Sequence, residues 1–213
     1  MGRRAEHSQD QQRRMALDAA RVIVARDGLR ALSVRDIAKR MGYAAGTLYQ
    51  LFADLDDLII AMNCETLELL AAAAGKVDLK GDPADVLIRL ADVYISLVTR
   101  EPKRWNAVFE YSPPAGRQMP ERYQQAVGNL LALVQKVIDP LFRPGQEARR
   151  LHEARVMWSG LYGIMTLASS RKSSVEIDTA AMVHSLAKTY IAGIRALNPT
   201  GAKPQRKTRK PHG

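Results

Sequence analysis

The feature that most constrains this chain is the spacing of its apolar residues. Between almost every pair of helix breakers, apolar side chains recur with the 3.6-residue period of an α-helix. In residues 10–26, for example, the period predicts that Met15, Ala19, Val22 and Ile23 are buried. No stretch alternates apolar and polar residues long enough to predict a β-strand. The sequence therefore predicts an all-α protein.

Capping residues and breakers divide the chain into successive helices. Gly28, Gly42 and Gly75 are expected to end helices, and Ser33 and Asp54 to begin them as N-caps. Proline and glycine predict a loop over residues 112–120. The predicted helices cover about 10–26, 33–42, a short segment holding Leu48 and Phe52, 54–75, 83–100, 103–110, 120–138, 146–170 and 178–197.

Positive charge is concentrated at the two ends of the chain. The formal net charge is +10; residues 1–50 and residues 199–213 each carry an excess of 5, which leaves residues 51–198 neutral. A basic end that attracts a polyanion, attached to a neutral body, is typical of a nucleic-acid-binding module on a separate scaffold. The alternative is charge that serves solubility, with a disordered tail.

Several classes of protein are excluded. The single cysteine, Cys64, rules out a disulfide framework or a Cys-rich zinc site, and His152 and His184 have no ligand-spaced partners. The chain has no secretory signal and no apolar run of about 18 residues that would span a membrane. It lacks a catalytic Ser/His/Asp set and a phosphate-binding loop. We expect a soluble, cytoplasmic protein that is not an enzyme and binds no metal, cofactor or membrane.

Residues 33–52, SVRDIAKRMGYAAGTLYQLF, have the outline of two short helices joined by a tight turn. This is the helix-turn-helix plan, which many helical proteins contain by accident. The basic first helix, the capped second helix and the string GTLYQLF occur together here, and residues 10–60 resemble the DNA-binding domain of the TetR/AcrR family of transcriptional regulators. The matching residues are Ala19-Ala20, Gly28, Ser33-Val34-Arg35-Asp36-Ile37-Ala38, Gly42, Gly46-Thr47-Leu48-Tyr49, Phe52, Asp54 and Leu58.

The resemblance implies a set of DNA-contacting residues. Arg35 is expected to bind guanine O6 and N7 or a phosphate, or else to pair with a surface acid. Tyr49 grips phosphate together with Thr47, or packs in the core. Ser33 binds phosphate, caps its helix, or does both. The full predicted set is Ser33, Arg35, Ala44, Ala45, Gly46, Thr47, Tyr49 and Gln50.

The second helix of this unit has few side chains that can read bases. Only Thr47 and Gln50 on its outward face can hydrogen-bond to a base edge, so Arg35, DNA shape and half-site spacing are expected to supply much of the specificity. Leu55 stands where the family often has a phosphate-binding lysine. We expect a basic N-terminal arm to compensate, through Arg3, Arg4, Arg13 and Arg14.

The resemblance also implies a C-terminal domain that binds a small molecule and dimerises through its last two long helices. MWSGLYGIMTL, residues 157–167, resembles a subgroup marked by Trp-x-x-x-His-Gly, with Tyr162 in place of histidine. Gly160 and Gly163 predict close helix packing, either between two subunits or within one. The candidate effector-binding residues, each of which can instead be ordinary core, are Tyr94, Trp105, Phe109, Tyr111, Tyr123, Trp158 and Met165.

Together these patterns predict a basic flexible arm (1–9), a helix-turn-helix DNA-binding domain (10–54), a connecting helix (55–75), a larger helical domain (76–198) and a disordered basic tail (199–213). Cys64, on the connecting helix, is either a buried structural cysteine or a redox sensor.

The predicted function is a dimeric repressor that leaves a palindromic operator in double-stranded DNA when an unidentified small molecule binds. The alternatives are an activator, a ligand-independent regulator, a small-molecule-binding protein with vestigial DNA binding, or a nonspecific nucleic-acid-packaging protein.

Overall fold

A computed structural model describes residues 7–169 and 178–198. Within these ranges the chain is helical and contains no strand, which confirms the all-α prediction. The predicted arm falls largely on residues 1–6, which lie outside the described residues, as do the tail 199–213 and residue 170, the predicted end of a helix. The elements are α1 (Gln9–Asp27), η1 (Leu29–Ala31), α2 (Val34–Met41), α3 (Ala45–Leu51), α4 (Leu55–Ala74), α5 (Pro83–Arg100), α6 (Pro102–Glu110), α7 (Glu121–Ile138), η2 (Asp139–Leu141), α8 (Glu147–Ser169) and α9 (Thr179–Leu197).

The first three helices enclose a core that continues onto the start of α4. Ile37 of α2, Leu48 of α3 and Leu58 of α4 are all buried in it. The expectation that Val22 is buried is wrong, because 43% of this side chain is exposed. The buried stripe of α1 runs through Ala16, Ala20 and Val24, at a spacing of i, i+4 and i+8, and Val22 lies beside this stripe.

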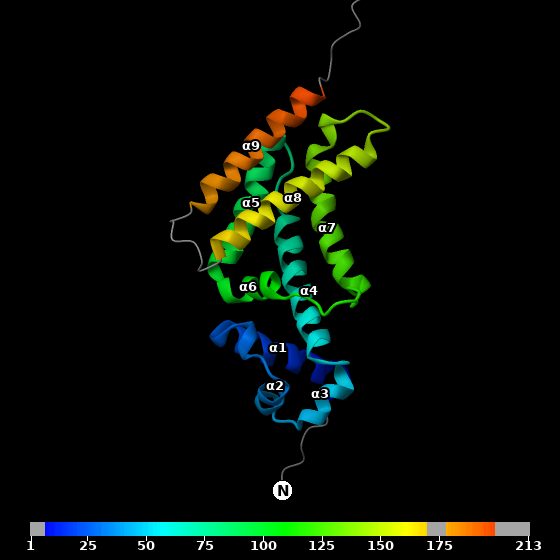
Figure 1. The fold of residues 1–213 in the computed structure, drawn as a ribbon, viewed down its shortest axis with the longest axis vertical. Helices are drawn as coiled ribbons and strands as arrows, with labels where there is room; N and C mark the ends of the chain where they lie inside the picture. The colour runs from blue at the N-terminus through cyan, green and yellow to red at the C-terminus, as the bar shows by residue number, and fades with distance from the viewer. Residues whose placement is uncertain (1–6, 170–177, 199–213) are drawn as a thin grey trace, which may run out of the picture.

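Helix α4 leaves this unit and runs into the body formed by α5, α7, α8 and α9, while α6 lies at the boundary between the two parts (Figure 1). Its buried residues face the first core near its start and the second part of the molecule further along. α4 is therefore one rigid element shared by both parts. No helix in the described ranges is long and apolar enough to cross a membrane.

The two predicted packing glycines of α8 differ in their surroundings. A Cβ atom on Gly160 would lie 3.0 Å from Cδ2 of Leu186, so this glycine allows α8 to approach α9 of the same chain. Around Gly163, apart from its chain neighbours and the backbone of its own helix, no atom of the described residues lies within 4 Å of such a Cβ. Gly160 therefore has a role within the subunit, and only Gly163 lies on an open part of α8.

Candidate DNA-binding surface and effector cavity

Local caps fix both ends of α2, the first of the two helices in the predicted DNA-binding unit. The Oγ of Ser33 accepts a hydrogen bond from the Asp36 amide at 3.2 Å and donates one to the Asp36 carboxylate at 2.5 Å, so Ser33 caps α2. Gly42 ends α2 with φ of 76°, the left-handed conformation that favours glycine. Its amide donates to the carbonyls of Ala38 and Lys39, and α3 begins three residues later, at Ala45.

The predicted DNA-contacting residues lie together on the outer side of this unit. Ala44, Ala45, Gly46 and Gln50 are exposed, and Thr47 is half-buried. Tyr49 is 62% exposed, so its ring lies outside the core. Leu48 and Leu51 on the opposite side of α3 are buried. α3 thus presents a flat outer surface made of small side chains with one projecting phenol.

Arg35 lies on the same outer side, in the first turn of α2. Its side chain is exposed and has no ion-pair or hydrogen-bond partner in the part of the chain that the structure describes. Three further cations, Arg30, Lys39 and Arg40, are exposed on η1 and α2 of the same unit. Their positive charge was visible in the sequence, but their exposure depends on the fold. These cations make the surface attractive to phosphate.

Arg13 has a different place from the one expected. It lies on α1, where its Nη1 donates to the carbonyl oxygen of Leu51 at 2.5 Å, and its guanidinium lies 4.1 Å from the centre of the Phe52 ring. Leu51 is the last residue of α3, so Arg13 caps the C-terminus of that helix instead of extending toward DNA. Arg14, its neighbour, is exposed.

At the start of α4, where the family often has a lysine at position 55, the side chains make contacts within the protein. Leu55 is half-buried against the first core, and the Asp54 carboxylate caps α4 by accepting from the Asp57 amide at 2.8 Å. Arg117, in the loop between α6 and α7, lies 2.8 Å from Asp54 and 3.8 Å from Asp56. The hydrogen bond from Arg117 lowers the pKa of Asp54. Asp54 and Asp56 therefore connect the start of α4 to the loop between α6 and α7.

An apolar cavity of about 60 Å³ lies between α4, α5, α7, α8 and α9. Of the predicted effector residues, Tyr94 and Trp158 line it, together with aliphatic side chains such as Leu70 and Leu130. Small-molecule sites usually measure about 300–1,000 Å³. Side chains must therefore move before this cavity can hold an effector.

The other predicted effector residues lie beside the cavity or away from it. Trp105, Phe109, Tyr123 and Met165 belong to the adjoining core cluster, where the Trp105 and Tyr94 rings make an edge-to-face contact with centroids 5.3 Å apart. Tyr111 packs against the first core instead. Burial, with Asp56 nearby, raises the pKa of Tyr111 to about 12. The structure thus separates Tyr111 from the remaining candidates.

Comparisons with known proteins agree with this geometry. Residues 16–62 match the family model described as bacterial regulatory proteins, tetR family, and residues 87–190 match the model described as the tetracyclin repressor-like C-terminal domain. The chain belongs to the TetR family. Neither description names the Trp-x-x-x-His-Gly subgroup, which stays a prediction.

Relatives of this TetR-family chain match most of its length at low identity. An uncharacterised HTH-type transcriptional regulator of Mycobacterium tuberculosis is 24% identical over 182 residues, which are 85% of this chain and 81% of the relative. A TetR-family regulator from Streptomyces coelicolor has the same fold, with a TM-score of 0.66 at 17% identity over 90% of this chain and 83% of that chain. The TetR-family repressor FadR of Thermus thermophilus, in complex with lauroyl-CoA, has a TM-score of 0.65 at 16% identity over 94% and 100%.

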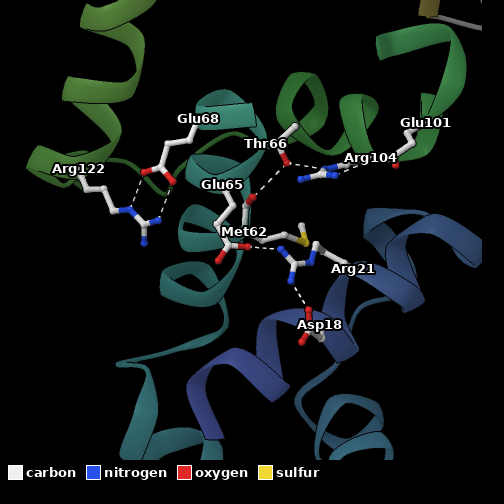
Figure 2. Close-up of polar contacts among 9 residues, drawn as sticks. All are labelled: Asp18, Arg21, Met62, Glu65, Thr66, Glu68, Glu101, Arg104 and Arg122. Atoms are coloured by element: carbon white, nitrogen blue, oxygen red, sulfur yellow. Dashed lines mark hydrogen bonds and ion pairs between the residues drawn. The ribbon is translucent and has the colours of Figure 1, made fainter. Parts of the chain in front are cut away.

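In this TetR-family chain, polar contacts tie α4 to its neighbours on several sides (Figure 2). Toward α1, Arg21 forms ion pairs with Asp18 and with Glu65 of α4. Toward α7, Arg122 donates two hydrogen bonds to Glu68, at 2.8 and 2.9 Å. The Arg122 hydrogen bond lowers the pKa of the Glu68 carboxyl. These contacts connect α4 to both α1 and α7.

Toward α6 the contact with α4 is buried. Arg104 donates through Nε to Oγ1 of Thr66 at 3.0 Å, and Thr66 donates to the carbonyl of Met62 at 3.1 Å (Figure 2). Asn63 donates to the carbonyl of Ala107 at 3.3 Å. Thr66 and Asn63 are both buried polar residues, whose hydrogen bonds would be costly to break.

Proposed function

We propose that this chain is a repressor that recognises a palindromic operator through α2 and α3. The observation that carries the proposal is the outer surface of α3, with small side chains beside the partner-free Arg35. Small residues let a helix backbone approach the floor of the major groove, and a guanidinium fits guanine O6 and N7. Ser33, Thr47 and Tyr49 hold phosphates on either side.

The repressor acts as a cytoplasmic homodimer that associates through α8 and α9. Exposed apolar side chains on these helices support this arrangement: Val156, Leu167, Met182 and Leu197. A two-fold dimer places two recognition helices on successive major grooves, which is why the operator is palindromic. In this proposal residues 10–54 read DNA, residues 55–75 connect, and residues 76–198 bind the effector and the partner subunit.

An effector that enters the cavity beside Tyr94 and Trp158 releases the operator. The apolar lining favours a largely apolar molecule, and the FadR structures from Thermus thermophilus and Bacillus subtilis contain lauroyl-CoA and stearoyl-CoA. The effector shifts the equilibrium only if it prefers the released state. About 100-fold tighter binding to that state contributes roughly 2.7 kcal/mol per site.

Selection of bound fragments from random DNA tests this function. We expect a palindromic sequence to be enriched, and its affinity to fall when an effector is added. A salt titration on the selected sequence and on a scrambled one separates specific binding from simple charge attraction. Equal affinity for both sequences, with a steep salt dependence for each, would contradict the proposal. A variant that lacks residues 199–213 is the control for nonspecific binding by the tail, and should select the same sequence.

A further inference from the structure

A second, larger hollow lies at the boundary between the DNA-binding unit and the rest of the molecule. This cleft measures about 450 Å³ and is formed by α1, by Met62 of α4 and by the corner where α5 meets α6. It is much larger than the apolar cavity of about 60 Å³ in the C-terminal part. The cleft therefore has room for a small molecule without rearrangement of the core.

Four basic side chains line the cleft, and two of them are already neutralised. Arg21 pairs with Asp18 and Glu65, and Arg104 pairs with Glu101 at 2.9 Å. Figure 2 shows Arg21 reaching α4 from α1 and Arg104 reaching it from α6. Arg21 and Arg104 therefore have a structural role in the cleft, and their charges are already paired.

The other two, Arg100 and Lys103, are exposed and form no ion pair with a carboxylate in the described ranges. Arg100 donates to Oγ of Ser96 at 3.4 Å, and Lys103 donates to the carbonyl of Arg26. Asp27 is already paired with Arg26, and the charge of Lys103 lowers the pKa of Asp27 more weakly than Arg26 does. Arg100 and Lys103 thus leave positive charge unneutralised at one side of the cleft.

Part of the cleft lining is apolar. It includes Val22 and Ala25 of α1, Met62 of α4 and Pro102 of α6. Val22 is 43% exposed although it is β-branched and apolar, so covering it with a ligand removes apolar surface from water. The combination suits a molecule with an anionic head and an apolar body.

We propose that this cleft binds a small amphipathic organic anion, with its carboxylate, sulfonate or phosphate at Arg100 and Lys103 and its apolar part on Val22. The site is separate from the apolar cavity beside Trp158. Its walls come from both parts of the chain, so an occupant fixes α1 relative to α6 and changes the angle at which α3 meets DNA. This regulatory consequence rests on the proposed function, whereas the binding itself does not.

Fluorescence titration with anilinonaphthalenesulfonate, an apolar sulfonate, tests the binding. The uncharged N-phenylnaphthylamine serves as the matched neutral probe. In the double variant Arg100→Gln/Lys103→Gln we expect the sulfonate to bind about tenfold more weakly, since each exposed charge pair contributes a factor of a few. Binding of the neutral probe should not change. The control Lys76→Gln/Lys80→Gln removes the same charge from an exposed loop and should leave both affinities unchanged.

The variant Val22→Trp fills the cleft without altering its charge. Because Val22 is largely exposed, the larger side chain can be accommodated, and we expect it to block the sulfonate. Unchanged sulfonate affinity in the Arg100/Lys103 variant would overturn the proposal. It would equally be overturned if that variant weakened binding and Val22→Trp did not, since the sulfonate would then sit on the charged surface outside the cleft.

Operator binding measured with and without saturating anilinonaphthalenesulfonate tests the regulatory part. We expect the probe to change operator affinity in the natural protein and to cause no further change in Val22→Trp, whose larger side chain already fills the cleft. Binding in the cleft without any shift in operator affinity would refute the regulatory part alone. If no operator can be selected at all, the proposed function fails, while the probe titration still decides whether the anion site exists.

Discussion

The guanidinium of Arg117 lies 2.8 Å from the carboxylate of Asp54, although the two residues are 63 positions apart in the chain. Asp54 is the N-cap of α4 and follows α3 by only a few residues. Arg117 belongs to the loop between α6 and α7, which connects to the helices around the apolar cavity. The pair therefore joins the C-terminal part of the protein to the short segment between α3 and α4.

Replacing Arg117 by Gln should weaken this connection in a pH-dependent way. The pKa of Asp54 is lowered below its ordinary value of 3.8, first by the hydrogen bond from Arg117. A carboxyl with a lowered pKa stabilises the fold above its unfolded pKa, and this contribution is lost as the pH falls through the folded pKa. The variant should thus be less stable than the natural protein at neutral pH, with the difference disappearing in acid. Urea unfolding at several pH values measures this difference in stability, with Lys76→Gln as the control. A difference that does not change with pH would contradict the proposed ion pair between Arg117 and Asp54.

Arg13 should position α3 without touching DNA. In Arg13→Gln, loss of the bond to the Leu51 carbonyl and of the contact with Phe52 should cost about 1–2 kcal/mol of stability. Operator affinity should fall as well, because α3 loses its C-terminal cap. The slope of affinity against salt should remain that of the natural protein. A slope lower by about one would instead show that Arg13 neutralises a phosphate. Lys76→Gln, which removes one exposed charge from the turn after α4, is the matched control.

Arg35 and Gln50 should differ in how they affect base preference. Arg35 is free to reach a base, and its fork can bind guanine with two hydrogen bonds. Arg35→Ala should cost about 1–3 kcal/mol at one base position and relax the preference there, while Gln50→Ala should change it less. Repeating the random-DNA selection with each variant measures this. A uniform loss over all sequences would show that Arg35 contacts phosphate only.

The helices and the helix-turn-helix could be predicted from the sequence because caps and breakers act locally. Ser33, Gly42 and Asp54 each determine a helix end through atoms only a few residues away. The contacts of Arg13 and Arg117 could not be predicted, because each crosses a long stretch of chain and depends on how helices pack.

The candidate effector cavity was harder to predict from composition. The aromatic residues do gather in the C-terminal part, but most of them fill space against one another, and Tyr111 lies elsewhere. Whether a cavity remains depends on small differences in side-chain volume, which a helical period does not reveal. The prediction for Val22 failed for a similar reason. The helical period does not fix which face of α1 packs against the core, and Val22 lies outside the buried stripe, in the lining of the cleft.

Cys64 should be inert in the folded protein, in spite of its place on the helix that joins both parts. Its side chain is 1% exposed, and burial raises the pKa of the thiol from 9.0 to about 11. Thiolate is the reactive form, so both its low population and its lack of access slow modification. A chromogenic disulfide reagent at mildly alkaline pH should react with the native protein only as fast as the protein opens, and at once in guanidinium. Rapid reaction of the native thiol, accompanied by loss of operator binding, would instead make Cys64 a redox sensor. In that case the burial of Cys64 would be transient, because the thiol can react only while α4 is separated from the helices that cover it.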